Sequence, residues 1–157
     1  MTYTQAPHLT DEERDDFLKE AKTARICSIN EDGTIHAVPV WFKYEGGQFI
    51  IATIEKNRKV RNIVRNNNVT LLIDIGSPVI RGVIVYGKAE VDLKAWDPDA
   101  INLFEKYMSR EEAEKLWQIN NEWAKWVKIT VKPDRMTSFD YTKDEFWKDV
   151  EKRMGWE

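Results

Sequence analysis

Cysteine and histidine are scarce in this sequence. Among its 157 residues, Cys27 is the only cysteine, and His8 and His36 are the only histidines. One cysteine cannot form an intrachain disulfide framework or a cysteine-rich metal site. Two histidines give little support to a histidine-based metal centre. We therefore expect no metal in this protein, and we interpret Cys27 as a buried structural thiol.

Glycine, proline and long apolar runs are also limited. The sequence has 7 glycines and 5 prolines, which excludes low-complexity and collagen-like architectures. No run of about 18 apolar residues is present, so we expect no membrane span. Residues 1–10 lack the basic start and apolar stretch of a signal peptide, which predicts a cytoplasmic location. The net charge of -3 gives no electrostatic reason to expect a nucleic acid or a membrane surface as partner.

The remaining composition is typical of a globular chain. Hydrophobic residues make up 42% of the sequence and charged residues 32%, and the length suits one domain over residues 1–157. Thr10 and Glu13 form a capping-box pattern that predicts a helix over residues 11–22. Helical spacing also predicts a short helix within residues 56–66, two helices between residues 97 and 123, and a last helix after residue 142.

Alternating and β-branched segments predict the strands. Turn chemistry at Asp32-Gly33, Gly46-Gly47 and Ser77-Pro78 separates several of them, and another turn is expected at residues 133–135. The first three strands are expected to form a meander. Six antiparallel strands with helices outside indicate a closed or nearly closed barrel. The six segments cover residues 24–29, 35–44, 49–53, 69–75, 79–91 and 126–131.

The segment from Ala52 to Asn62 carries the clearest chemical signal. A buried strand is expected to end at Thr53, and a helix to begin near Arg58. Free backbone N–H groups at a helix start attract anions, and Thr53 and Asn57 can add hydrogen bonds. Arg58 and Lys59 can bind a phosphate directly. The alternative interpretation is a solvated basic helix face with no ligand.

Five segments together resemble the flavin-binding split-barrel family, whose best-known members are the pyridoxamine 5'-phosphate oxidases. They are residues 26–33, 38–42, 49–53, 57–63 and 83–91. The resemblance implies an α+β fold that is mainly β, a six-stranded antiparallel split β-barrel with peripheral helices. It also implies a homodimer with flavin mononucleotide (FMN), or the 8-hydroxy-5-deazaflavin coenzyme, at the subunit interface.

The resemblance also implies a set of cofactor-binding residues. By residue match, Thr53, Asn57, Arg58 and Lys59 would hold the phosphate, with Ala52 beside Thr53. The ring system would lie along Val38, Pro39, Val40 and Trp41. Gly82 occupies the place where the oxidases carry a glutamine that contacts the flavin.

Departures from the oxidase pattern narrow the expected activity. Ala37 and Phe42 stand where the oxidases have an arginine and a lysine, and the tail that binds pyridoxal phosphate is absent. We therefore do not expect pyridoxamine-phosphate oxidation. The expected function is an FMN-binding oxidoreductase that acts on an unidentified small substrate. The alternatives are a deazaflavin-dependent reductase, or a flavin carrier or electron-transfer protein without its own substrate. No catalytic side chain is assigned.

Overall fold

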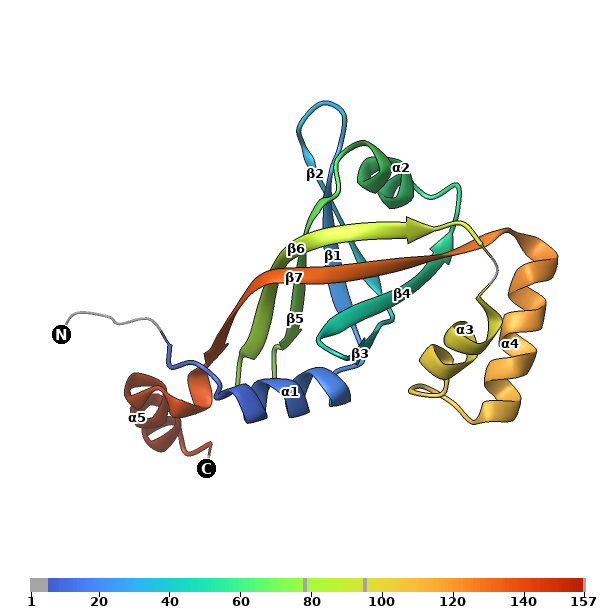
Figure 1. Cartoon of the computed structure of the whole chain (residues 1–157). Coiled ribbons are helices and arrows are strands. Elements are labelled where there is room, and N and C mark those ends of the chain that lie inside the picture. Colours follow the sequence, from blue (N-terminus) through green and yellow to red (C-terminus); the bar gives the residue numbers. More distant parts are fainter. Residues whose placement is uncertain (1–5, 78, 95, 157) are drawn as a thin grey trace.

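The computed structural model describes residues 6–77, 79–94 and 96–156. Within them, helices surround a strongly curled antiparallel sheet (Figure 1). The helices are α1 (Asp11–Glu20), α2 (Arg58–Arg65), α3 (Asp97–Phe104), α4 (Arg110–Trp123), α5 (Glu145–Met154) and the short 3-10 helix η1 (Tyr141–Lys143). The strands are β1 (Ala24–Ile29), β2 (Ile35–Val40), β3 (Lys43–Glu45), β4 (Gln48–Ile54), β5 (Asn68–Ile75), β6 (Arg81–Asp92) and β7 (Trp126–Asp140).

The strand order explains why the sheet curls. Its order is β2-β1-β5-β6-β7-β4-β3, so β2 and β3 lie at opposite ends of the sheet. Only Trp41 and Phe42 join these two strands along the chain. A two-residue link can span the two ends only if the sheet bends round until they approach each other. The result is a half-barrel, which confirms the expected fold class but has seven strands in place of six.

The same link corrects two expectations. Residues 35–44 do not form one strand, and the first three strands are not a meander, because β2 pairs with β1 and β3 pairs with β4. The reason lies in Phe42, whose side chain is fully buried. Its backbone N–H donates to the hydroxyl of Tyr107, 2.9 Å away, so it is bound outside any strand ladder. The alternation of apolar residues continues through this corner and conceals it.

The expected turn at residues 133–135 is also wrong. β7 runs without interruption from Trp126 to Asp140 beside β6. Pro133 lies opposite Gly87 and Arg135 lies opposite Tyr86, so the pairing shifts register at this point. A β-bulge tolerates proline because one residue there leaves the hydrogen-bond ladder. A side chain at Gly87 would place its Cβ 2.3 Å from the Lys132 carbonyl oxygen, so glycine allows the close approach.

Most of the expected helices and the remaining strands are present, with small shifts at their ends. The capping box of Thr10 and Glu13 forms at the start of α1. β6 begins at Arg81 and not at residue 79. The turn expected at Ser77-Pro78 includes Pro78, which lies outside the described residues. None of the described helices is long and apolar enough to span a membrane.

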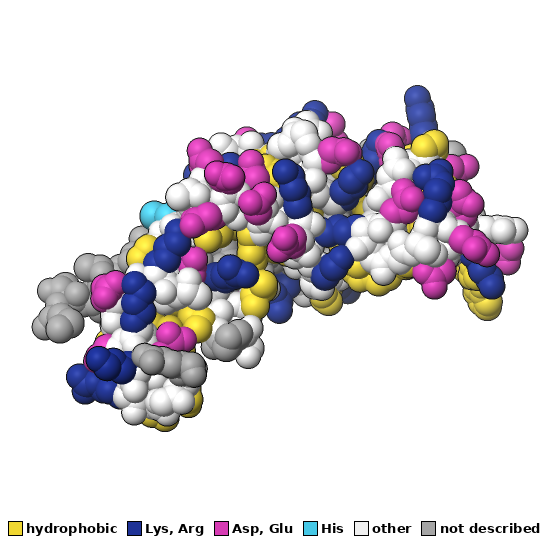
Figure 2. All heavy atoms as spheres, turned by 90° about the horizontal axis from the view of Figure 1, so that it is seen from below, with side chains coloured by type: hydrophobic (Ala, Val, Ile, Leu, Met, Phe, Trp, Pro, Cys, Tyr) yellow, Lys and Arg dark blue, Asp and Glu magenta, His cyan; other side chains and the backbone are white. Residues whose placement is uncertain are grey.

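Two apolar clusters hold the fold together. The first fills the half-barrel and includes Phe42, Phe49 and Ile51, which are fully buried. The second joins α3 and α4 and rests on Ile50 and Ala52 of β4. Because side chains alternate along a strand, β4 supplies residues to both clusters. Figure 2 shows lysine and arginine side chains intermixed with acidic ones on one outer face, so neither sign of charge dominates that face.

Candidate functional site

The start of α2 presents backbone donors with no partner inside the described chain. Asn57 precedes the helix, but its side chain does not cap it. The Asn57 amide instead donates to the hydroxyl of Thr53, 3.1 Å away. No hydrogen bond joins the backbone N–H of Arg58 or Lys59 to another described backbone or side-chain acceptor. These two N–H groups point out of the helix, where its dipole favours a negative charge.

Lys59 is a buried cation without a counterion. The residue is 8% exposed, and its amine forms no ion pair or hydrogen bond within the described residues. Burial lowers the pKa of this amine, because the charged form loses its water. Buried charges in proteins are normally paired, so an unpaired buried lysine calls for an anion from outside the chain.

Lys59 faces a cavity of about 350 Å³ between the end of β4, the start of α2 and the α3–α4 pair. Small-molecule sites span roughly 300–1,000 Å³, so a ring system fits this space. The cavity brings together seven residues that the sequence singled out, namely Pro39, Val40, Trp41, Ala52, Thr53, Asn57 and Lys59. Other residues complete the lining, namely Ile54, Phe104, Leu116, Asn120 and Trp126.

Three of the expected site residues do not line this cavity. Val38 is half-buried and packs against the barrel core. Arg58 lines a neighbouring hollow of about 510 Å³ between α2 and the β1–β2 hairpin. Gly82 pairs with Asp74 on β5 and Phe139 on β7, toward the opposite end of β6 from α2 and α3. A side chain at Gly82 would place its Cβ 2.6 Å from the Ile73 carbonyl oxygen, so close packing already accounts for this glycine.

Aromatic contacts fix one wall of the cavity. The Trp41 indole stacks on the Tyr107 ring, with centroids 4.4 Å apart, and meets Phe104 edge-on at 6.2 Å. The Tyr107 hydroxyl lies 2.8 Å from the carbonyl oxygen of Lys22 and 3.0 Å from that of Phe42. Burial raises the pKa of Tyr107 to about 12, so the hydroxyl keeps its proton at neutral pH. Trp41 is therefore held in place while 43% of it stays exposed.

Positive charge extends from the start of α2 over β2. The pKa of His36 is lowered, first by partial burial and then by the charges of Arg58 and Lys59. Arg61 and Arg65 share the hollow with Arg58, and Glu31 and Asp32 line it as well. Among the described residues, no three His, Cys, Asp or Glu side chains converge to hold a metal ion. This region combines an unpaired buried amine and unpaired backbone N–H groups with a largely apolar cavity.

Comparison with known sequences identifies the family. Residues 10–127 match the pyridoxamine 5'-phosphate oxidase family, a span that contains the start of α2 and every residue that lines the cavity. The chain belongs to this family. No curated protein is similar enough to this sequence to count as a relative.

Several solved structures share the fold of this protein. A conserved hypothetical protein of Mycobacterium tuberculosis is 24% identical, with a TM-score of 0.73 over 90% of this chain and 92% of that one. An F420 reductase is 22% identical, with a TM-score of 0.63 over 81% and 98% of the two chains. An FAD-binding protein of Mesorhizobium loti is 16% identical, with a TM-score of 0.61 over 85% and 94%.

Several residues of the cavity had no local signal in the sequence. Phe104, Leu116 and Trp126 come from α3, α4 and the start of β7, and the first of them lies 42 residues beyond Asn62, the end of the segment that carries the chemical signal. The spacing of these residues in the sequence is that of ordinary core residues. A side chain that lines a cavity also packs against the core, so its position in the sequence does not reveal the cavity. Tyr107 likewise acts at a distance, through its contacts with Trp41 and Phe42. Only the folded chain brings these groups close to the start of α2.

Proposed function

We propose that this protein binds FMN in the cavity beside α2 and acts as an oxidoreductase on an unidentified small substrate. The observation that carries the proposal is Lys59, a buried amine that faces the cavity and has no partner in the described chain. A phosphate would supply the missing negative charge. The apolar lining beside it suits a flat ring system, and membership of the family supports a flavin.

Each group at the start of α2 has a distinct task in this proposal. The Lys59 ammonium and the backbone N–H groups of Arg58 and Lys59 bind the phosphate oxygens. The Thr53 hydroxyl accepts a hydrogen bond from the Asn57 amide, so its own O–H remains free to donate to the phosphate. Arg58 adds positive charge from the neighbouring hollow. These donors are fixed before the ligand arrives, which lowers the entropy cost of binding.

The ring system is proposed to lie along the end of β2. This strand is at one end of the sheet order, so the backbone groups on its outer side have no strand partner in the described sheet. Pro39, Val40 and Trp41 line the cavity there, with Ala52 across from them on β4. The bound flavin supplies the redox chemistry, while these residues orient it and limit its contact with water.

We further propose a homodimer in which the cofactor lies between the subunits. Several large apolar side chains are exposed on a single chain, among them Trp41 at 43%, Ile35 at 61% and Trp123 at 85%. Trp41 also lines the cavity, so a partner that covers it would close the site. Exposed aromatic residues of this kind are enriched where subunits meet.

The test of FMN binding compares a phosphorylated with an unphosphorylated flavin. Quenching of flavin fluorescence measures the affinity of the wild-type protein and of Lys59→Met for FMN and for riboflavin. Lys59→Met removes a charge-assisted contact of roughly 1.5–3 kcal/mol, so we expect its affinity for FMN to fall by at least about tenfold. Riboflavin affinity stays unchanged, and so does FMN affinity in Lys148→Met, which removes an exposed lysine on α5. Equal FMN affinity of Lys59→Met and the wild type would overturn the proposal.

The second candidate cofactor is the 8-hydroxy-5-deazaflavin coenzyme. Its phosphate is followed by a chain that carries carboxylates, and Arg58 and Arg61 line the hollow next to the phosphate site without an ion pair among the described residues. Titration of this coenzyme and of FMN, each before and after substitution of Arg61, separates the two ligands. Loss of Arg61 is expected to weaken binding of the deazaflavin coenzyme and to leave binding of FMN unchanged. A flavin carrier without its own substrate would bind reduced flavin but reduce no acceptor faster than free flavin does.

A further inference from the structure

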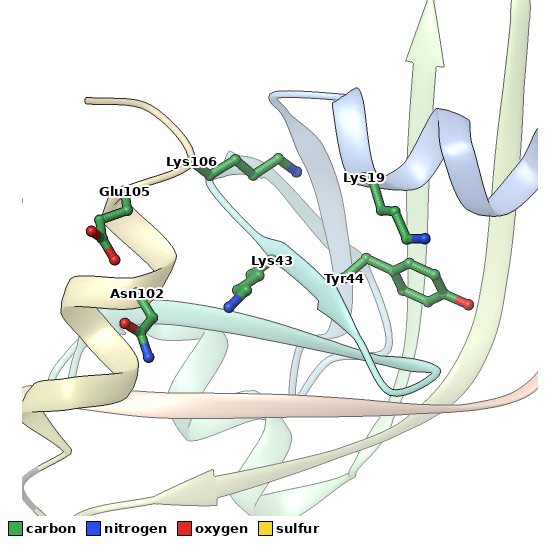
Figure 3. Close-up of a pocket in the computed structure, with 6 residues that line it drawn as sticks. All are labelled: Lys19, Lys43, Tyr44, Asn102, Glu105 and Lys106. Carbon is green, nitrogen blue, oxygen red and sulfur yellow. The ribbon is translucent and has the colours of Figure 1, made fainter. Parts of the chain in front are cut away.

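A second pocket, separate from the proposed flavin cavity, lies between α1, β3 and the end of α3 (Figure 3). Its volume is about 380 Å³. Asn102 lines this pocket and Phe104 lines the flavin cavity. Two residues along a helix differ by about 200° in direction, so the two spaces lie on opposite sides of α3. The six lining residues are Lys19, Lys43, Tyr44, Asn102, Glu105 and Lys106.

Lysines dominate the charge of this pocket. Figure 3 shows Lys19, Lys43 and Lys106 around one space, from α1, β3 and the turn after α3 respectively. Lys19 and Lys106 have no carboxylate partner among the described residues. Lys43 lies 3.3 Å from Glu45, and the only acid in the lining, Glu105, is already paired with Arg110 at 3.4 Å. The pocket therefore carries positive charge that the described chain does not neutralise.

The amine of Lys106 is held by backbone carbonyl groups and an aromatic ring. This amine donates to the carbonyl oxygens of Phe42 at 3.2 Å and Leu18 at 3.5 Å, and it lies 3.9 Å from the centre of the Phe42 ring. All these partners are neutral. Burial, and then the nearby charge of Lys22, lower the pKa of Lys106 to about 8. A cation in this position gains from any negative charge that enters the pocket.

We propose that this pocket binds a small oxyanion with two or more negative charges, such as a phosphate monoester or a polycarboxylate. Three amines on three sides match a ligand with several charged oxygens better than a monovalent ion. The Asn102 amide adds donors, since it has no hydrogen bond within the described residues. The Tyr44 hydroxyl donates to Asp15 at 3.2 Å, so its ring forms a wall and not a donor.

Binding of such an anion is linked to proton uptake. An anion beside Lys106 raises the pKa of its amine back toward the ordinary value, so the protein takes up part of a proton near pH 8. Glu105, which directly follows α3, repels an incoming anion, and its ion pair with Arg110 weakens this repulsion. The other titratable groups that face Lys106 are Lys19 and Lys22 from α1 and the loop after it, Lys43 and Tyr44 from β3, and Tyr107 beyond α3.

The test uses sulfate, a divalent anion that does not itself titrate near pH 8. Calorimetric titrations are made in the Lys59→Gln protein, so that sulfate binds the proposed flavin phosphate site more weakly, and the substitutions below show which site gives the signal. Sodium chloride at matched ionic strength gives the baseline. We expect one saturable site with uptake of up to about half a proton, measured from two buffers of different ionisation enthalpy. Phosphate and citrate titrations then show whether a phosphate or a polycarboxylate is preferred.

Substitutions locate the binding. Lys19 is exposed and has no hydrogen bond or ion pair among the described residues, so Lys19→Gln leaves the fold intact. The double substitution Lys19→Gln and Lys43→Gln is expected to lower the affinity for sulfate by at least about tenfold, since two charge-assisted contacts are lost. Lys148→Gln, an exposed lysine on α5, leaves it unchanged. No saturable binding above the chloride baseline, or binding that the double substitution does not weaken, would overturn the proposal and leave FMN binding untouched.

Discussion

The indole of Trp41 lies 4.4 Å from the ring of Tyr107, and the two planes differ by only 10°. Trp41 lines the proposed flavin cavity, whereas Tyr107 follows α3 and lies outside that lining. The same tyrosine binds the backbone of Phe42, the second residue of the link between β2 and β3. One side chain thus holds both the corner of the half-barrel and a wall of the cavity.

Tyr107→Phe is expected to lower the free energy of unfolding by about 1–3 kcal/mol, because it leaves the Phe42 N–H without its acceptor. Urea unfolding measures this change. Tyr86→Phe is the matched control, since the Tyr86 hydroxyl has no hydrogen bond within the described residues. FMN affinity is expected to change little in Tyr107→Phe, because the ring that supports Trp41 remains. Equal stability of the two variants would contradict the assigned role of the hydroxyl.

Arg58 and Lys59 are expected to contribute unequally to phosphate binding. Lys59 is buried and faces the cavity, whereas Arg58 is exposed and lines the adjacent hollow. Replacement of both residues by alanine is predicted to weaken FMN by at least about a hundredfold, from two contacts of roughly 1.5–3 kcal/mol each. Lys59→Ala alone carries most of this loss. Isothermal titration of the two single variants checks the order, and a larger effect of Arg58→Ala would reverse our assignment.

Gly82→Ala tests whether this glycine serves the fold or the cofactor. The added Cβ would lie 2.6 Å from the Ile73 carbonyl oxygen and 2.9 Å from the Phe139 ring. Such overpacking costs roughly 1–3 kcal/mol of stability. Gly76→Ala is the control, because a Cβ there meets nothing within 4 Å. We expect lower stability of Gly82→Ala with unchanged FMN affinity. A selective loss of FMN binding in a stable variant would restore the cofactor role that the family resemblance implied.

The sequence predicted what depends on local pattern. The capping box at Thr10, the strands with clear alternation and the basic start of α2 needed no distant contact. The strand break at Trp41 and Phe42 was missed because Phe42 continues the apolar alternation, and only its bonds to Tyr107 remove it from the ladder. The residues around Pro133 predict a turn, because a single sequence does not show that Gly87 lies opposite Pro133 in a bulge.

The candidate site also contains residues that the sequence predicts and residues that it does not. The residues of the basic segment and of β2 lie close together because each is near the end of an element that meets the start of α2. The opposite wall comes from α3, α4 and β7, whose apolar residues follow an ordinary core pattern in the sequence. Gly82 was assigned by family position alone, and the structure places it away from the cavity lining.

Lys106 makes stability depend on pH in a predictable direction. Its pKa is lowered from 10.5 to about 8 in the folded chain, so the protonated amine destabilises the folded state near pH 7. This penalty is complete below pH 8 and disappears as the pH rises toward 10.5, where both states hold a neutral amine. Urea unfolding of the wild type and Lys106→Met should therefore show a difference that shifts in favour of the wild type from pH 7 to pH 10. The shift is on the order of 1–3 kcal/mol.

A constant difference between these two proteins across the pH range would contradict the lowered pKa. Lys22→Met serves as a second probe. It removes the nearby charge but leaves the burial of Lys106, so the pH dependence should weaken and not vanish.

The last prediction concerns assembly. Trp123 is 85% exposed and Trp41 43% exposed on the single chain, which favours a partner surface that covers large apolar groups. If the proposed flavin cavity is completed by a second copy, a ligand that binds only the dimer stabilises the dimer by mass action. We predict a two-fold symmetric dimer whose melting temperature rises with added FMN, and from which dilution toward the monomer releases the flavin.

Analytical ultracentrifugation with detection at the flavin absorbance follows assembly and cofactor binding together. Lys59→Met supplies the control, since it should weaken the flavin signal without preventing the apolar faces from meeting at high protein concentration. Trp123→Glu places a charge on the exposed face of α4, and it is expected to weaken the dimer if that face lies at the contact. In the shared-site arrangement, FMN affinity falls whenever the dimer dissociates. A monomer that sediments with stoichiometric flavin would show that one chain builds the whole site, because the cavity would then need no residue from a partner.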